Sequence, residues 1–115
     1  MNGVLVSRSE LYVAPAIVPS DNGTISRSAI AGNRATYVLP LYDGIEVGQE
    51  YTLAVLTNGQ WDWFTYGTID STTEVVTRTV FDALFVGATK ATASYTIKQP
   101  GGEKRSLDAE YEVVD

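Results

Sequence analysis

The 115-residue chain contains neither cysteine nor histidine. Without cysteine it can form no disulfide and no thiolate metal site. Without histidine it lacks the side chain that most often works as a general acid or base near neutral pH. These absences favour a binding or building module over an enzyme, and we predict no cofactor and no bound metal.

Basic residues are also scarce, because 8 Lys and Arg stand against 14 Asp and Glu, for a net charge of −6. A nucleic-acid partner needs a basic face that neutralises phosphates. This chain offers only the Lys104-Arg105 pair and scattered single bases. We therefore expect no nucleic-acid partner and no attraction to an anionic membrane surface.

Long apolar runs are missing as well. No stretch approaches the roughly 18 apolar residues of a spanning helix, so membrane insertion is not expected. Residues 1–6 have no basic region and no apolar run of signal-peptide length. The expected alternatives are a protein that stays inside a cell or virion, one secreted or displayed by a signal-independent route, or a piece of a larger chain.

The chain does contain short runs rich in Val, Thr, Tyr and Ala, separated by turn dipeptides such as Asn22-Gly23, Asp43-Gly44 and Gly101-Gly102. Its 44% hydrophobic and 19% charged residues are typical of an ordered globular domain. About seven such runs at hairpin-like spacing predict an all-β, antiparallel β-sandwich. We expect one domain over residues 12–115, after a flexible lead-in over residues 1–11.

The alternation of apolar and polar residues, together with the positions of turn residues and prolines, predicts the individual strands. Residues 50–56 are apolar on both faces, which predicts a central strand. Asn58-Gly59 predicts a type I′ hairpin turn and a returning strand over residues 60–66. Pro15 predicts that residues 12–18 form an edge strand. The other expected elements are a short strand at 24–25 followed by a polar loop, strands at 34–39, 72–81, 90–98 and 105–114, and one helical turn at 82–85.

The same alternation predicts which side chains are buried. The expected core is Val38, Leu53, Val55, Val76, Val80, Tyr95, Ile97, Leu107, Tyr111 and Val113. Bases on residues 90–98 and acids on residues 105–114 predict cross-strand charge pairing. Asp108, Glu110 and Glu112 would spread along one strand rather than converge on a calcium ion, so we interpret them as a solvated face.

The most unusual stretch is residues 60–66, in which four of seven residues are aromatic. On a strand, Trp61 and Trp63 project to one side, and Asp62, Phe64 and Tyr66 to the other. One aromatic set should enter the core, and the other should lie on an outer face. Aromatics beside a carboxylate form either a sugar-stacking platform or a protein-binding hot spot, unless both indoles simply cap the core. These five residues are the predicted ligand-binding site.

No set of residues stands out as catalytic. Acid–base chemistry without histidine would need a carboxylate pair, such as Asp62 with Asp70 or Glu74, in one cleft. Nothing in the sequence sets their separation, so we predict no enzymatic activity.

Several segments together resemble a known family. They are Ala14-Pro15-Ala16-Ile17-Val18, Asn22-Gly23-Thr24-Ile25, Ala35-Thr36-Tyr37-Val38, Tyr42-Asp43-Gly44-Ile45 with Val47-Gly48-Gln49, and Ala93-Ser94-Tyr95-Thr96-Ile97 with Ser106-Leu107. Over residues 13–114 the chain resembles the immunoglobulin-like repeats of long, repetitive surface proteins of Gram-negative bacteria. It departs from them in having Val55 where they tend to carry Trp, and in being a single copy. The resemblance implies an immunoglobulin-like sandwich with a role in adhesion or display, and no catalytic residues.

Three hypotheses follow. The first is a non-catalytic bacterial adhesion or protein-interaction module, which acts through residues 61–66 or by edge-strand pairing into a homo-oligomer. The second is a small lectin-like, carbohydrate-binding protein that uses the same aromatics. The third is a structural component of a phage or secreted assembly. The expected partner is thus a protein or a glycan.

Overall fold

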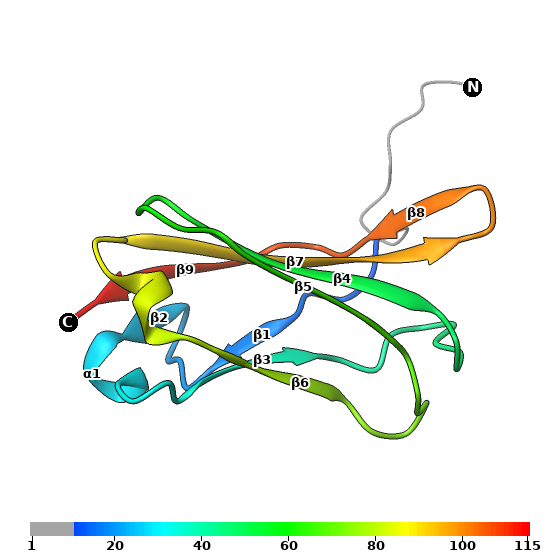
Figure 1. Ribbon diagram of the computed structural model, residues 1–115, viewed down its shortest axis with the longest axis horizontal. Helices are drawn as coiled ribbons and strands as arrows, with labels where there is room; N and C mark the ends of the chain where they lie inside the picture. The colour runs from blue at the N-terminus through cyan, green and yellow to red at the C-terminus, as the bar shows by residue number, and fades with distance from the viewer. Residues whose placement is uncertain (1–10) are drawn as a thin grey trace.

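A computed structural model describes residues 11–115 and folds them into two β-sheets that pack face to face (Figure 1). The predicted all-β sandwich is confirmed. It has nine strands where about seven were expected, and three of the nine are only three or four residues long. The strands are β1 (Ala16–Val18), β2 (Thr24–Ser26), β3 (Ala35–Leu39), β4 (Glu50–Thr57), β5 (Trp63–Thr68), β6 (Val76–Val80), β7 (Lys90–Gln99), β8 (Gly102–Arg105) and β9 (Ala109–Val114).

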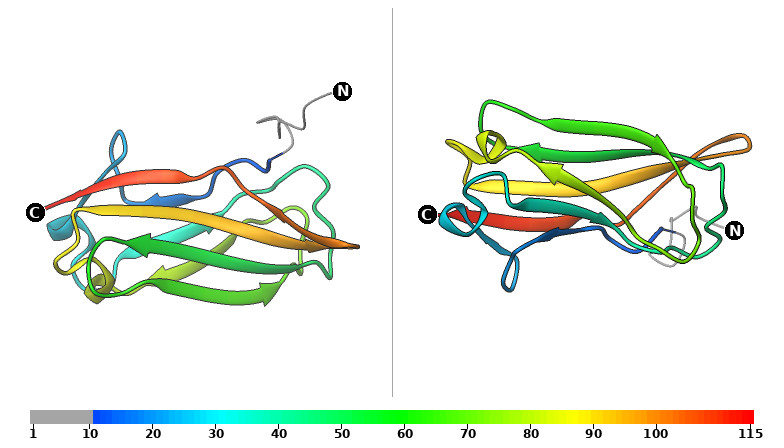
Figure 2. Two further views of the ribbon diagram at one scale, coloured as in Figure 1. Left: turned by 90° about the horizontal axis from the view of Figure 1, so that it is seen from above. Right: turned by 60° about the horizontal axis from the view of Figure 1, so that its bottom comes forward.

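The smaller sheet has the order β1-β3-β6, and the larger has the order β2-β9-β7-β4-β5, with β8 paired to one end of β7. Among the described strands, only β2 and β9 pair in parallel. Strand β4 lies between β5 and β7, as its two apolar faces predicted. Strand β5 is the outermost strand at one end of the larger sheet and lies at the bottom of the left-hand view in Figure 2.

The core lies between the sheets and is built from alternate residues of each strand. On β4 the buried positions are Tyr51, Leu53 and Val55, and on β7 they are Ala91, Ala93, Tyr95 and Ile97. Six of the predicted core residues are buried, namely Leu53, Val55, Val80, Tyr95, Ile97 and Val113. Val76 and Tyr111 are half-buried and pack against this core.

The predicted core positions Val38 and Leu107 are wrong, since both are only half-buried and lie outside the core cluster. Strand β3 turns its other face inward, which buries Tyr37 and Leu39. The phenol of Tyr37 tolerates this burial because its hydroxyl donates a 2.7 Å hydrogen bond to the carbonyl of Ser94 on the opposite sheet. A satisfied tyrosine thus selects the buried face of β3.

Near the amino end, strand β1 does lie at a sheet edge, as Pro15 predicted, but only its last three residues are strand. Earlier in the chain, Tyr12 makes a single bridge to Ser106. The expected polar loop after β2 is instead a short helix, α1 (Arg27–Ile30), which buries Ile30. Residues 1–10 of the predicted lead-in lie outside the described residues.

The expected single strand over residues 105–114 is divided into β8 and β9 by residues 106–108. The reason is Ser106, the only polar residue buried within the described part of the chain. Its hydroxyl accepts the N–H of Tyr95 at 3.0 Å and so replaces a backbone acceptor. The next N–H, that of Leu107, turns to the carbonyl of Tyr12 at 2.8 Å. The ladder with β7 is therefore interrupted before β9 begins.

Two further predictions concern the helical turn at residues 82–85 and the charge pairing between strands. The predicted helical turn is present as η2, a 3-10 helix over Asp82–Phe85. Lys90 and Glu112 lie opposite each other in the register of β7 and β9, but within residues 11–115 no ion pair joins these two strands. The cross-strand ion pair on β7 is instead formed with β4, between Lys98 and Glu50 at 3.7 Å.

Candidate functional site

The loop between β4 and β5 decides where the aromatic residues point. The prediction of a type I′ turn at Asn58-Gly59 is wrong, because neither residue has a positive φ. The side chain of Asn58 instead accepts the backbone N–H groups of Thr89 and Lys90, at 2.8 and 3.0 Å. Gly59 favours a close approach here, since a Cβ would lie in tight contact, 3.2 Å from the carbonyl oxygen of Val86. The loop is thus tied to the chain that enters β7.

Asp62 closes this loop. One oxygen of its carboxylate accepts the N–H of Thr57 at 2.9 Å, and the Thr57 hydroxyl donates to the carbonyl of Trp61 at 2.6 Å. The five residues 58–62 therefore form the connection, and β5 begins at Trp63 rather than at residue 60. The carboxylate of Asp62 was predicted to accept hydrogen bonds from the hydroxyl groups of a ligand, but in the structure it stabilises the loop between β4 and β5.

The two tryptophans do not share a face, contrary to the prediction. Trp63 lies on the inner face of β5, half-buried, with its ring centroid 5.5 Å from that of Tyr37 on the facing sheet. Trp63 therefore caps the core, which was the alternative given above for both indoles. Trp61 lies in the loop with 61% of its surface exposed. Only Trp61 therefore stays available for contact with a partner.

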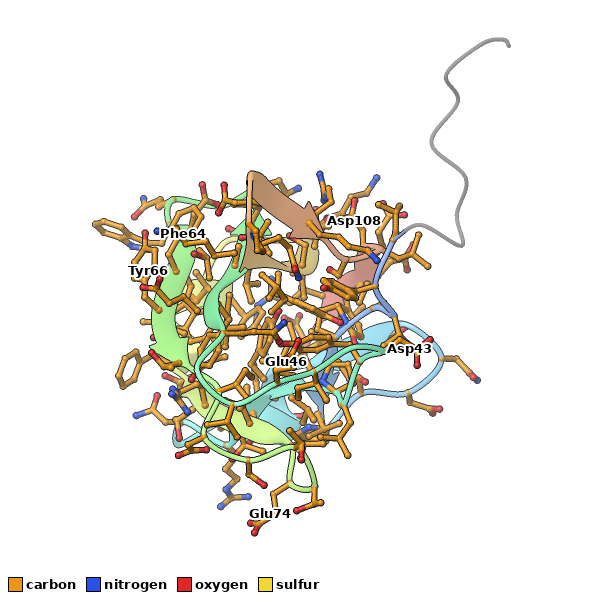
Figure 3. All side chains as sticks on the ribbon, turned by 90° about the vertical axis from the view of Figure 1, so that its right-hand side faces the viewer. Asp43, Glu46, Phe64, Tyr66, Glu74 and Asp108 are labelled. Atoms are coloured by element: carbon orange, nitrogen blue, oxygen red, sulfur yellow. The ribbon has the colours of Figure 1, made fainter. Side chains whose placement is uncertain are left out.

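Phe64 and Tyr66 occupy the outer face of β5, with 52% and 71% of their surfaces exposed. Figure 3 shows both projecting from the same flank of the molecule, on the side away from Asp43 and Asp108. Opposite them on β4 lie only small side chains, Ala54 and Thr52. Since small neighbours cannot cover aromatic rings, the two rings stand clear of the sheet. We call Phe64 and Tyr66 the outer aromatic pair.

The backbone of β5 is also available. Among the described strands it pairs with β4 alone, so every second N–H and C=O points away from the sheet. Within residues 11–115, no loop or side-chain hydrogen bond uses a backbone group of Trp63–Thr68. The strand contains no proline and no charged residue. We call this side of β5 the free edge.

The other ends of the two sheets are protected in the usual ways. The edge strands β1 and β2 are only three residues long, and prolines precede and follow β1. Short strands and nearby prolines are devices that natural sheets use against unwanted pairing. The free edge of β5 has neither device, so its exposure is a specific property of one side of the sandwich.

A contact between β5 and β4, which the sequence analysis did not predict, supports the free edge. Gly67 on β5 lies opposite Tyr51 on β4, and the tyrosine ring covers the glycine. Arg78 on β6 donates to the hydroxyl of Tyr51, with its guanidinium 5.7 Å from the ring centroid. The two sheets are therefore joined behind β5. A glycine inside a strand pattern was the available signal, because it often marks such a close approach.

The chemistry of this surface is that of binding. It offers aromatic rings and unpaired backbone groups, while the strongest pKa shifts lie elsewhere, among buried tyrosines. Burial raises the pKa of Tyr42 to about 12 and also raises the pKa of Tyr95, beside which it packs with ring centroids 6.0 Å apart. Within residues 11–115, no group of three or more acidic side chains is placed to hold a metal ion.

No protein-family model matches the chain, and neither a curated protein nor a solved structure matches it. The resemblance to bacterial immunoglobulin-like repeats therefore stays a prediction. Neither helix of the described residues is long and apolar enough to cross a membrane.

Proposed function

We propose that this protein is a non-catalytic protein-interaction module of immunoglobulin-like type, with a role in bacterial adhesion or display. Its contact surface is the free edge of β5 together with the outer aromatic pair and Trp61. The observation that carries the proposal is an unprotected edge strand that bears exposed aromatic side chains. Exposed edges bind extended segments by strand addition, and aromatic residues dominate protein-binding hot spots.

The strand order supports the immunoglobulin-like part of the proposal. In constant-type domains the first, second, fourth and fifth strands form one sheet, and the third, sixth and seventh form the other. Here β1, β3 and β6 form one sheet, while β4, β5, β7 and β9 lie in the other. In this correspondence β5 takes the place of the extra strand that variable-type domains add beside their third strand.

A lectin-like function is the second candidate, and one observation favours it. A shallow groove beside Tyr66 is lined by Glu50, Thr52, Lys98 and Glu103, which could accept and donate hydrogen bonds to a sugar stacked on the ring. We rank it second because Asp62 and Trp63, two of the five residues on which a sugar platform was predicted, are engaged within the fold. A structural role in a phage or secreted assembly would use the same edge and is a form of the first proposal.

The proposal is tested by selecting binders from a displayed library of extended peptides, in parallel with a glycan array. For a selected peptide we expect Phe64→Ala and Tyr66→Ala each to weaken binding roughly 30-fold, the effect of losing a hot-spot side chain of ~2 kcal/mol. Phe81→Ala is the matched control, because Phe81 is equally exposed but follows β6 on the other sheet. Its affinity should stay within about twofold of the unmodified protein.

Two results would overturn the proposal. One is that the selected peptides bind equally well to the Phe64 and Tyr66 variants, which would place the contact surface elsewhere. The other is specific glycan binding that Tyr66→Ala abolishes, combined with no peptide binding, which would establish the lectin-like alternative instead.

A further inference from the structure

We infer that the free edge of β5 pairs with the same edge of a second copy of this chain, in an antiparallel register centred on Thr65. This inference rests on the proposed function and names the partner. Pairing of one strand with its own copy uses the same surface twice about a two-fold axis. The result is a closed dimer in which the two larger sheets become one continuous sheet.

The register follows from the sequence of β5. Opposite residues of an antiparallel pair project to the same face, so outer side chains must meet outer side chains. Centring the pair on Thr65 sets Phe64 opposite Tyr66 of the other copy, twice. It also sets Trp63 opposite Gly67, the smallest partner for a large inner side chain. Aromatic pairs of this kind are among the favourable cross-strand contacts.

Slipping the register loses this match. If the register moves by one residue, Phe64 of one copy lies opposite Thr65 of the other. An outer side chain is then set against an inner one. A shift by two keeps the faces but sets Tyr66 or Phe64 against itself, which leaves the other aromatic without an aromatic partner. The register centred on Thr65 therefore satisfies both the matching of faces and the pairing of aromatic side chains.

Charge permits two copies to approach each other at the free edge of β5 and opposes such an approach at the edge of β6. Although the chain carries −6, β5 has no charged side chain, and the acids nearest to it, Asp62, Asp70 and Glu50 on β4, lie at or beyond its two ends. The acidic residues Asp108, Glu110 and Glu112 are on or next to β9, three strands away, or roughly 14 Å at ~4.8 Å per strand. That exceeds the screening length of about 8 Å at physiological salt. Self-pairing of β6 about its central residue would instead set Arg78 against Arg78.

The absence of cysteine makes a direct test possible, because any introduced thiol is unique. In the inferred dimer, Thr65 lies opposite Thr65 of the other copy, with Cα atoms roughly 4.5–5.5 Å apart, inside the range of a disulfide. Two copies of Thr68 would be six residues apart along the strand, or roughly 20 Å. Thr68 is the matched control, and it is the more exposed of the two threonines.

Under mild oxidation we expect Thr65→Cys to form a cross-linked dimer and Thr68→Cys to stay a monomer. Sedimentation of the unmodified protein should show a mass that rises with concentration toward that of two chains. Equal cross-linking of the two variants, or a monomer at every concentration with no preferential cross-linking of Thr65→Cys, would overturn the inference.

Complementary charge variants guard against simple misfolding. F64K/Y66K and F64E/Y66E should each remain monomeric, since the register sets like charges opposite each other. Mixing the two should restore the dimer, because each lysine then faces a glutamate. A mixture that stays monomeric would also overturn the inference. If the unmodified protein is monomeric yet binds selected peptides at β5, self-pairing fails while the proposed interaction function survives.

Discussion

Replacing Gly67 with alanine tests the contact that supports the free edge. An added Cβ would lie 2.5 Å from Cζ and 2.8 Å from Cε1 of Tyr51, well inside ordinary contact distance. Tyr51 is buried and its hydroxyl is bonded to Arg78, so the ring has little freedom to move aside. Overpacking of this kind costs about 1–3 kcal/mol. For a domain of this size that lowers Tm by roughly 4–12 °C.

The assay is thermal unfolding followed by circular dichroism, for Gly67→Ala alone and in a Tyr51→Ala background. Without the ring, the added methyl group meets no obstacle, and alanine in a strand is favoured over glycine by about 0.5 kcal/mol. The cost of Gly67→Ala should therefore disappear in the double variant, with a coupling energy of at least ~1 kcal/mol. An equal loss of stability in both backgrounds would refute the reasoning, since the cost would then not come from the ring.

Three further predictions concern the loop, the strand break and alkaline pH. Asp62→Ala should destabilise the fold by about 1 kcal/mol in chemical denaturation, because the N–H of Thr57 loses its acceptor, whereas Asp62→Asn should cost less. Ser106→Ala should cost ~1–3 kcal/mol, because it leaves the N–H of Tyr95 without its buried partner; a loss under 0.5 kcal/mol would contradict this. Burial raises the pKa of Tyr42 to about 12 and also raises that of Tyr95, so the unfolded chain loses these protons first, near pH 10. Stability is then complete below pH 10 and falls above it by up to ~1.4 kcal/mol per pH unit for each tyrosine, as denaturation at stepped pH would measure.

The sequence predicted best those strands that bury one regular face. Strands β4 and β7 were placed within a residue or two of their bounds, because their alternation is long and the turn after β7 contains Gly101 at positive φ. It failed where a side chain has a tertiary task. Asn58 looks like a turn residue but binds the backbone of the distant Thr89, and Ser106 interrupts a strand that alternates without a break in sequence.

The candidate site was predicted in part for the same reason. The exposure of Phe64, Tyr66 and Trp61 agrees with a surface aromatic cluster, but Trp63 and Asp62 serve the fold. The register of β5 against β4 differs from the predicted one, because the loop between them takes five residues rather than two. This difference accounts for the roles of Trp63 and Asp62. The free edge was out of reach of sequence reasoning, because the outermost position of β5 depends on the order of all the strands in the sheet.

The most direct test of the account is amide hydrogen exchange over residues 63–68, measured across a range of protein concentrations. Unpaired edge amides exchange quickly, and pairing with a second copy protects them. We predict that protection appears in β5 as concentration rises, while β1 and β2 are unchanged. Protection elsewhere without β5, or none at the highest soluble concentration, would contradict the account.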